Sequence, residues 1–172
     1  WLQGGRISIG FLGAAQLDKF GNINTTVIGD YKSPKTRLPG GGGAPEIASS
    51  AKQIFITMKQ SLRGMVEKID FYTSFGHGKG KGHRKSLNID TEGPNLLITD
   101  LAVWKPDPIS KEFKVSSMHK GVTKAMVQDN CGWKVKYFDS LEITQPPTEL
   151  ELKTLRDLKN RTEIANSRRE TN

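Results

Sequence analysis

Residues 39–46 read Pro-Gly-Gly-Gly-Gly-Ala-Pro-Glu, and the four glycines, Gly40–Gly43, have the composition of a backbone ligand site. This glycine loop lacks side chains, so its N–H groups can approach a ligand closely, and positive φ angles carry no steric cost. A helix predicted over Pro45–Lys52 adds the positive end of a dipole beside it. The pattern therefore predicts a site for an anionic or carbonyl oxygen. It matches neither a P-loop nor a dinucleotide fingerprint, because no Gly-Lys-Ser/Thr follows and prolines flank the glycines.

A second segment with polar side chains, residues 13–25, follows the first predicted strand. The small residues 13–15 permit close backbone approach, and polar groups gather near a strand end, where α/β folds collect ligands. These polar residues are Gln16, Asp18, Asn22 and Asn24. The Phe-Gly-Asn sequence at 20–22 is also good turn chemistry, and taken alone the segment fits an ordinary turn better than a site.

The stretch from Gly76 to Arg84 holds two histidines, His77 and His83, in a glycine-rich loop. Without a nearby Cys or Asp they make a weak pattern for a metal site, and no metal is expected. The same loop carries the densest basic patch of the chain, formed by Lys79, Lys81, Arg84 and Lys85. A mobile, positively charged loop that closes over a ligand fits better, and the patch can meet a phosphorylated small molecule. No Gly-x-Ser-x-Gly nucleophile elbow is present.

The elements that must position these segments are mostly strands. β-branched and aromatic residues bounded by Gly, Pro, Asn or Ser predict five of them: Arg6–Gly13, Ile23–Ile28, Gln53–Met58, Met65–Phe71 and Asn95–Asp100. The continuous apolar runs at 54–56 and 96–98 are typical of strands covered on both faces. Residues 112–116, which follow Asp107-Pro108, are predicted to form one arm of an exposed hairpin.

Two further helices are expected. Thr123 can cap a helix over Lys124–Asn130, which Gly132 ends. Thr148 and Glu151 form a capping box that opens a C-terminal helix behind Pro146-Pro147. The result is one α/β domain over residues 1–160, followed by a polar tail at 161–172 that is expected to fray.

The composition sets the class of protein. A chain of 172 residues, 35% of them hydrophobic, suits one globular domain with an adequate core. No apolar run approaches the roughly 20 residues that span a bilayer, and no signal peptide is recognisable. The single cysteine, Cys131, fits a packing role and a reducing compartment, so a cytoplasmic location is expected. The chain begins with Trp1 and runs directly into a strand pattern, which favours the rear part of a longer polypeptide.

The formal net charge of +8 raises the possibility of nucleic-acid binding. Basic and acidic residues interleave through most of the chain, however, which is typical of a solvated surface. Aromatic residues do not interleave with the basic cluster either. A non-enzymatic basic module therefore ranks far behind an enzyme, and no nucleic-acid or membrane partner is expected.

Several segments in order resemble the second (β) subunit of family I CoA-transferases, and the glutaconate type most of all. The resemblance covers about residues 1–155. Its motifs are Gly13–Asp18, Gly21–Gly29, Arg37-Leu38-Pro39 with the glycines, Val66–Asp70, Tyr72-Thr73-Ser74, Leu97–Asp100, Gly121-Val122-Thr123 and Gly132-Trp133.

The resemblance implies a CoA-transferase-like fold (the NagB/RpiA/CoA-transferase type), with a sheet flanked by helices and a homologous α subunit as partner. It implies a coenzyme A thioester and a carboxylic acid as substrates, no bound cofactor, and covalent catalysis by a glutamate through a glutamyl-CoA intermediate. By analogy, Gly41, Gly42, Gly43, Asn24 and Gln16 would contact substrate and CoA. No catalytic residue is assigned, because the family's glutamate motif is not found in these residues.

A second interpretation stays open. Ser74–Gly78 followed by His83-Arg84, together with Gly43–Ile47, also resembles the relatives that hydrolytically open steroid-derived rings attached to CoA. Those enzymes rely on the α subunit for the glutamate, which is consistent with its absence here. The alternative is therefore the β subunit of a ring-opening hydrolase of the same superfamily.

Overall fold

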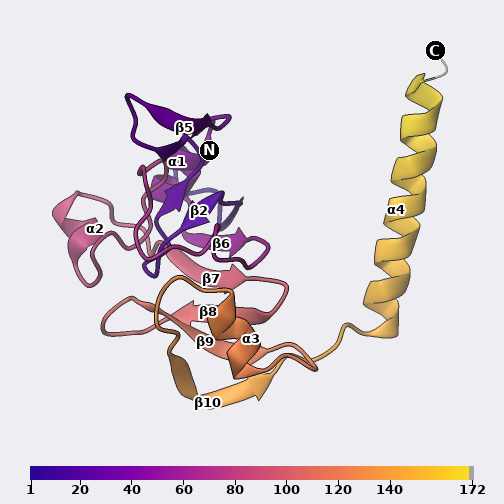
Figure 1. The fold of residues 1–172 in the computed structure, drawn as a ribbon. Coiled ribbons are helices and arrows are strands. Elements are labelled where there is room, and N and C mark those ends of the chain that lie inside the picture. The colour runs from indigo at the N-terminus through magenta and orange to yellow at the C-terminus, as the bar shows by residue number, and fades with distance from the viewer. Residues whose placement is uncertain (171–172) are drawn as a thin grey trace.

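The computed structural model of the chain describes residues 1–170, with side chains through residue 167. A six-stranded mixed sheet, in the spatial order β1-β6-β7-β8-β9-β10, forms its centre (Figure 1). β1, β6 and β7 run parallel, as do β9 and β10, whereas β8 is antiparallel to both of its neighbours. The strands are β1 (Ile9–Leu12), β6 (Gln53–Thr57), β7 (Pro94–Ile98), β8 (Ala102–Pro106), β9 (Phe113–Met118) and β10 (Tyr137–Ile143).

Two small antiparallel sheets lie between β1 and the first helix in the chain. They pair β2 (Gln16–Leu17) with β3 (Ile23–Asn24), and β4 (Val27–Gly29) with β5 (Pro34–Arg37). The single strand predicted over 23–28 is thus broken in two. The break arises because the Asn24 Oδ1 accepts the backbone N–H groups of Thr26 and Val27, at 2.9 and 3.2 Å, which turns the chain.

Helices complete the fold of the described residues: α1 (Ala44–Ser50), α2 (His83–Ser86), α3 (Lys124–Asp129) and α4 (Glu149–Glu170). α1 follows the glycine loop as predicted and packs closely on β1, where a Cβ added to Gly10 would collide with the Ile47 side chain. Both predicted helix starts are confirmed. The Thr123 Oγ1 accepts the Met126 N–H at 3.2 Å, and Glu151 accepts the N–H of Thr148 at 2.7 Å.

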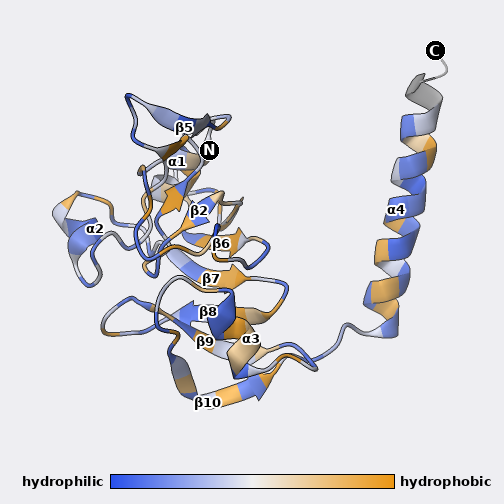
Figure 2. Cartoon of the chain, in the orientation of Figure 1, coloured by the Kyte–Doolittle hydropathy of each residue, from blue (hydrophilic) through white to orange (hydrophobic). Residues whose placement is uncertain are grey.

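The core lies on the face of the sheet that α1 and α3 cover, and it includes Leu12, Ile56, Leu97, Trp104 and Val127. Cys131 belongs to this core, and burial raises the pKa of its thiol to about 11, so the predicted packing role is confirmed. Figure 2 shows how apolar and polar residues are distributed over the strands. On β1 the outward-facing Phe11 is 64% exposed, so this strand is covered on one face only by the residues described.

Three elements differ from their predictions. Residues 65–71 form a loop with one bridge to Leu17, because Met65 and Ile69 are buried four residues apart and do not alternate as in a strand. The hairpin of β8 and β9 is confirmed, but it is not exposed, since β10 covers its far edge and both Phe113 and Val115 are fully buried.

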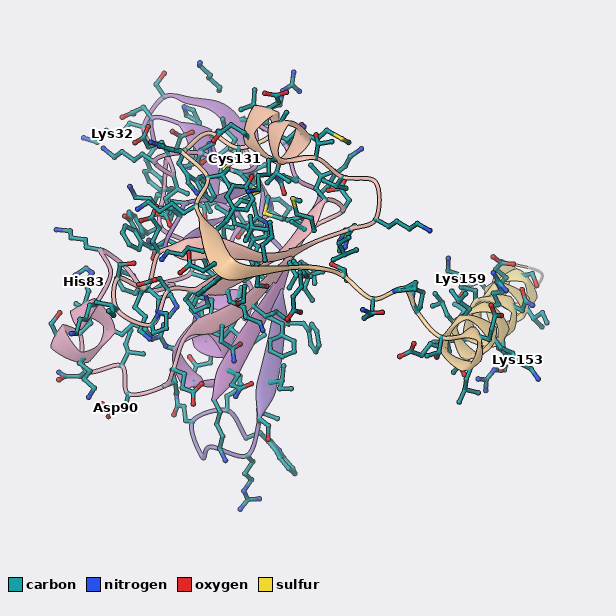
Figure 3. The ribbon with its side chains drawn as sticks, turned by 90° about the horizontal axis from the view of Figure 1, so that it is seen from below. Lys32, His83, Asp90, Cys131, Lys153 and Lys159 are labelled. Atoms are coloured by element: carbon teal, nitrogen blue, oxygen red, sulfur yellow. The ribbon has the colours of Figure 1, made fainter. Side chains whose placement is uncertain are left out.

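The third difference concerns the C-terminal helix. α4 continues through Glu170, so residues 161–170 are helical where fraying was expected, and residues 171–172 lie outside the described part of the chain. α4 stands apart from the sheet (Figure 1), and α2 lies on the opposite side of the body, as the positions of His83 and Lys159 show (Figure 3). The described side chains of α4 are almost all exposed.

Candidate active site

The glycine loop joins β5 to α1 and is anchored at its first residue. Gly40 adopts φ +97°, a conformation that favours glycine, and both of its backbone groups bond to Thr25. The Gly40 N–H donates to the Thr25 carbonyl, and the Thr25 hydroxyl donates to the Gly40 carbonyl, each at 2.9 Å. This double contact holds one end of the loop against the turn that follows β3.

Beyond Gly40 the loop opens to solvent. Gly42 and Gly43 are exposed, and a Cβ added at either position would meet no atom within 4 Å. Within the described part of the chain, the N–H groups of Gly41, Gly42 and Gly43 have no hydrogen-bond acceptor. The loop therefore presents a short row of backbone donors with free space in front of it, which is the arrangement that stabilises a developing oxyanion.

Gln16 and Asn24, the predicted polar contacts, lie behind the loop and bond to each other. The Asn24 amide donates to the Gln16 Oε1 at 2.7 Å and to the Val27 carbonyl at 2.6 Å. Gln16 in turn donates to Asp70 at 2.9 Å, and Asp70 also accepts the Gly29 N–H. That N–H, followed by Gln16, lowers the pKa of Asp70. Both amides are buried, so the geometry favours a supporting role, and direct ligand contact stays a prediction.

Asp18 and Asn22 are also internal, and they build the turn between β2 and β3. The Asp18 carboxylate accepts the N–H groups of Phe20 and Asn22, at 2.9 and 3.1 Å, and the Asn22 amide. Burial raises the pKa of Asp18, and these hydrogen bonds oppose the shift. The turn interpretation of this segment is therefore the one that the contacts support.

The loop that carries His77 is fastened to the same turn. The Asn22 Oδ1 accepts the N–H groups of Gly76 and Gly78, and its Nδ2 donates to the Gly78 carbonyl at 2.8 Å. His83 accepts the Lys79 N–H at 2.9 Å. These contacts favour a fixed loop over the mobile lid that its glycines suggest.

Arg84 is the buried centre of this region and does not belong to a surface basic patch. Its five N–H groups are all used: they donate to the carbonyls of Phe75, Gly76, Ala48 and Thr91 and to the Thr91 hydroxyl, at 2.6 to 3.2 Å. Burial lowers its pKa to about 10. No donor remains for a phosphate, so only Lys79, Lys81 and Lys85 stay available on this surface.

His77 is buried and neutral. Its Nε2 lies 2.7 Å from the Pro94 carbonyl, which can only accept, so the proton is on Nε2. Burial is the main cause that lowers the pKa of His77 to about 4. No cluster of three or more metal-ligating side chains occurs in the described part of the chain.

The buried His77 predicts a pH dependence of stability. Its pKa in the fold lies below the unfolded value of 6.5, so the unfolded state binds the extra proton first and stability falls as the pH drops from 6.5 towards 4. At pH 5 this site should cost about 2 kcal/mol relative to pH 7.5. We expect urea unfolding at the two pH values to show that loss, and His77→Gln, which keeps a donor for Pro94, to show a smaller one. An equal loss in both proteins would assign the effect to other groups, such as Asp18.

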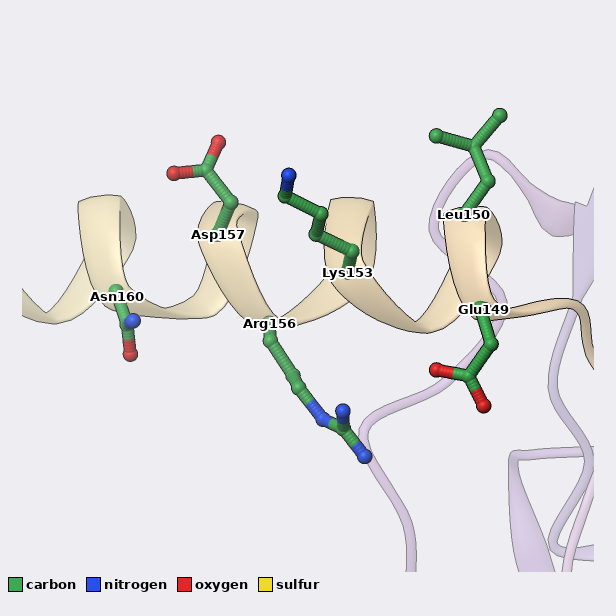
Figure 4. A pocket seen from close by; sticks show the side chains of 6 residues that line it. All are labelled: Glu149, Leu150, Lys153, Arg156, Asp157 and Asn160. Carbon is green, nitrogen blue, oxygen red and sulfur yellow. The ribbon is translucent and has the colours of Figure 1, made fainter.

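Two of the hollows in the surface lie away from the glycine loop. A groove of about 570 Å³ runs along α4 and is lined by that helix alone, with Lys153 and Asp157 on one side and Arg156 on the other (Figure 4). Because one helix cannot enclose a ligand, the groove makes no site. A second hollow of about 380 Å³ lies beside α2, where its lining includes His77 and Lys111. No helix among the described residues is both long and apolar enough to cross a membrane.

Comparison with known proteins gives the family. The model of the family described as coenzyme A transferase matches residues 1–130. The chain is 56% identical over 165 residues to the second (β) subunit of the 3-oxoadipate CoA-transferase of Pseudomonas knackmussii, covering 96% of this chain and 64% of the relative. It is 25% identical over 154 residues to the IpdB subunit of the cholesterol ring-cleaving hydrolase of Rhodococcus jostii, covering 86% and 57%.

A solved structure agrees with this relationship. The crystal structure of glutaconate coenzyme A-transferase from Acidaminococcus fermentans matches with a TM-score of 0.78 and 35% identity, over 86% of this chain and 56% of that one. The chain thus spans between about half and two thirds of the length of these relatives. The predicted CoA-transferase-like α/β fold is confirmed, and the resemblance noted in the motifs is the correct one. The chain belongs to the coenzyme A transferase family.

Proposed function

We propose that this chain is the part of a CoA-transferase β subunit that binds the thioester, and that the enzyme moves CoA between a short 3-oxo dicarboxylic acyl-CoA and a free carboxylic acid. The observation that carries the proposal is the row of free N–H groups at Gly41–Gly43, anchored through Gly40. A thioester carbonyl under attack becomes an oxyanion, and such donors stabilise it. The relative with 56% identity supports the 3-oxo acid class.

In the proposed reaction a glutamate outside these residues attacks the thioester carbonyl. The CoA thiolate leaves, and an acyl-glutamyl anhydride forms. The thiolate then attacks the glutamyl carbonyl and expels the acyl carboxylate, which leaves a glutamyl-CoA thioester. The acceptor carboxylate reverses the two steps and takes up the CoA. The role proposed for this chain is to hold each oxyanion at the glycine loop, while a homologous α subunit completes the enzyme.

The ring-opening hydrolase is the alternative, and the contacts give it less support. The loop from His77 to Arg84 suggested it, yet His77 bonds to Pro94 and Arg84 spends all its donors on neighbouring oxygens. The identity to the hydrolase subunit, 25%, is also well below 56%. The His77 loop therefore has a supporting role in either enzyme.

The test is a CoA-exchange assay on the complete enzyme assembled with its α-type partner. A 3-oxoacyl-CoA and a free dicarboxylic acid are mixed, and both thioesters are followed by chromatography. We expect one new thioester for each one consumed, with no release of free CoA. Consumption of the CoA-linked substrate without an acceptor acid, with uptake of water, would favour the hydrolase instead. No reaction in either assay would refute both.

A further inference from the structure

Thr73 contacts the same turn that anchors the glycine loop. Its hydroxyl oxygen accepts the Thr25 N–H at 2.9 Å and shares a hydrogen bond of 2.7 Å with the Thr26 hydroxyl. Thr25 holds both backbone groups of Gly40. The Thr73 side chain is thus one residue removed from the loop, and a continuous chain of hydrogen bonds joins it to Gly40.

The methyl group of Thr73 touches the loop itself. A Cβ built on Gly41 would lie 3.1 Å from the Thr73 Cγ2 and 3.1 Å from the Pro45 Cγ. Gly41 therefore sits in a narrow gap between these two side chains, whereas Gly42 and Gly43 meet nothing. The one side chain of Thr73 fixes the loop at two successive residues, through its hydroxyl at Gly40 and through its methyl at Gly41.

The backbone around Thr73 is held independently of its side chain. The N–H groups of Thr73 and Ser74 both donate to the Ile23 carbonyl, at 2.9 and 3.0 Å, and the Ile23 N–H donates to the Ser74 carbonyl at 2.9 Å. Loss of the hydroxyl would leave these three bonds in place. Removing it should therefore change the position of the turn and loop more than the fold of the segment.

We propose that Thr73 is a positioning residue that sets the place of the Gly41–Gly43 donors relative to the reacting carbonyl. The inference rests on the proposed function, since it concerns the same donors. Thr73 does not contact substrate; it acts through Thr25 and Gly40. Because a misplacement of about 1 Å can cost about 100-fold in rate, a small shift of the loop is enough to impair turnover.

The test compares Thr73→Val with Thr73→Ser in the complete enzyme. Val keeps the shape and removes the hydroxyl, so we expect kcat to fall about 10- to 100-fold while KM for the acyl-CoA stays within about threefold. Ser keeps the hydroxyl and should recover most of kcat. A normal kcat in the Val variant, or an equal loss in both variants, would overturn the proposal. If the Val variant does not fold, Thr25→Val decides, because it removes the bond to the Gly40 carbonyl; a normal kcat there would also overturn it.

Two controls separate this inference from the proposed function. Thr144→Val removes a hydroxyl that bonds to Ser117 at 2.9 Å, far from the loop in the sequence and on the β9–β10 edge, and should leave kcat unchanged. Gly43→Val probes the loop directly. If it abolishes turnover and Thr73→Val does not, only the positioning role fails. If neither variant alters kcat, the placement of the site fails as well.

Discussion

Gly43→Val is expected to lower turnover of the acyl-CoA by about 100-fold or more, since loss of one oxyanion-hole donor typically costs that much. Gly43 is exposed, and its φ of −85° is open to any residue. A valine there meets no atom of this chain within 4 Å of its Cβ, so it occupies the free space in front of the donors. The fold should lose only about 1 kcal/mol, from valine at the N-cap of α1.

The measurement is steady-state kinetics of CoA exchange, with circular dichroism and thermal unfolding to verify the fold. Gly42→Val is a poorer probe, because φ +49° at Gly42 strains any β-branched side chain. Gly4→Val is the matched control, since Gly4 is also exposed and its Cβ would approach only the Trp1 carbonyl, at 4.0 Å. Full activity in Gly43→Val would show that the ligand lies elsewhere.

The parts of the site that depend on local chemistry could be predicted from the sequence. Four glycines before a proline-led helix indicate an open backbone loop whatever surrounds them, and α1 begins at Ala44 as that pattern requires. The capping box at Thr148 is likewise local, because its two partners lie three residues apart. Such features need no tertiary partner, so their residue types are sufficient evidence.

Features that depend on distant partners could not be predicted. Gln16 and Asn24 look like ligand contacts because they are polar residues beside a strand end, but their amides bond to each other and to Asp70, which is 54 residues from Gln16. Thr73 is part of a motif that marks the family, yet nothing in the sequence indicates that it meets Thr25. Only the fold brings such pairs together.

Arg84 illustrates the same limit most clearly. In the sequence it continues a run of basic residues, and its charge indicates a surface that attracts phosphate. In the structure it is 6% exposed and joins α1, the 75–76 segment and Thr91 through five hydrogen bonds to oxygen. The helix that carries it, α2, is only four residues long, so its position depends on this side chain more than on helical propensity.

Arg84→Met is therefore expected to reduce the free energy of unfolding by about 3–5 kcal/mol, because each buried oxygen left without a donor costs about 1–3 kcal/mol and water can reach only some of them. Arg84→Lys should fall between the two proteins, since an ammonium has three donors for five acceptors. Lys85→Met, one residue along the same helix and exposed, is the control and should change stability by less than about 1 kcal/mol. Urea unfolding at neutral pH measures all three variants. A loss below about 1 kcal/mol in Arg84→Met would mean that solvent satisfies the abandoned carbonyls, and that α2 does not depend on Arg84 for its place against α1.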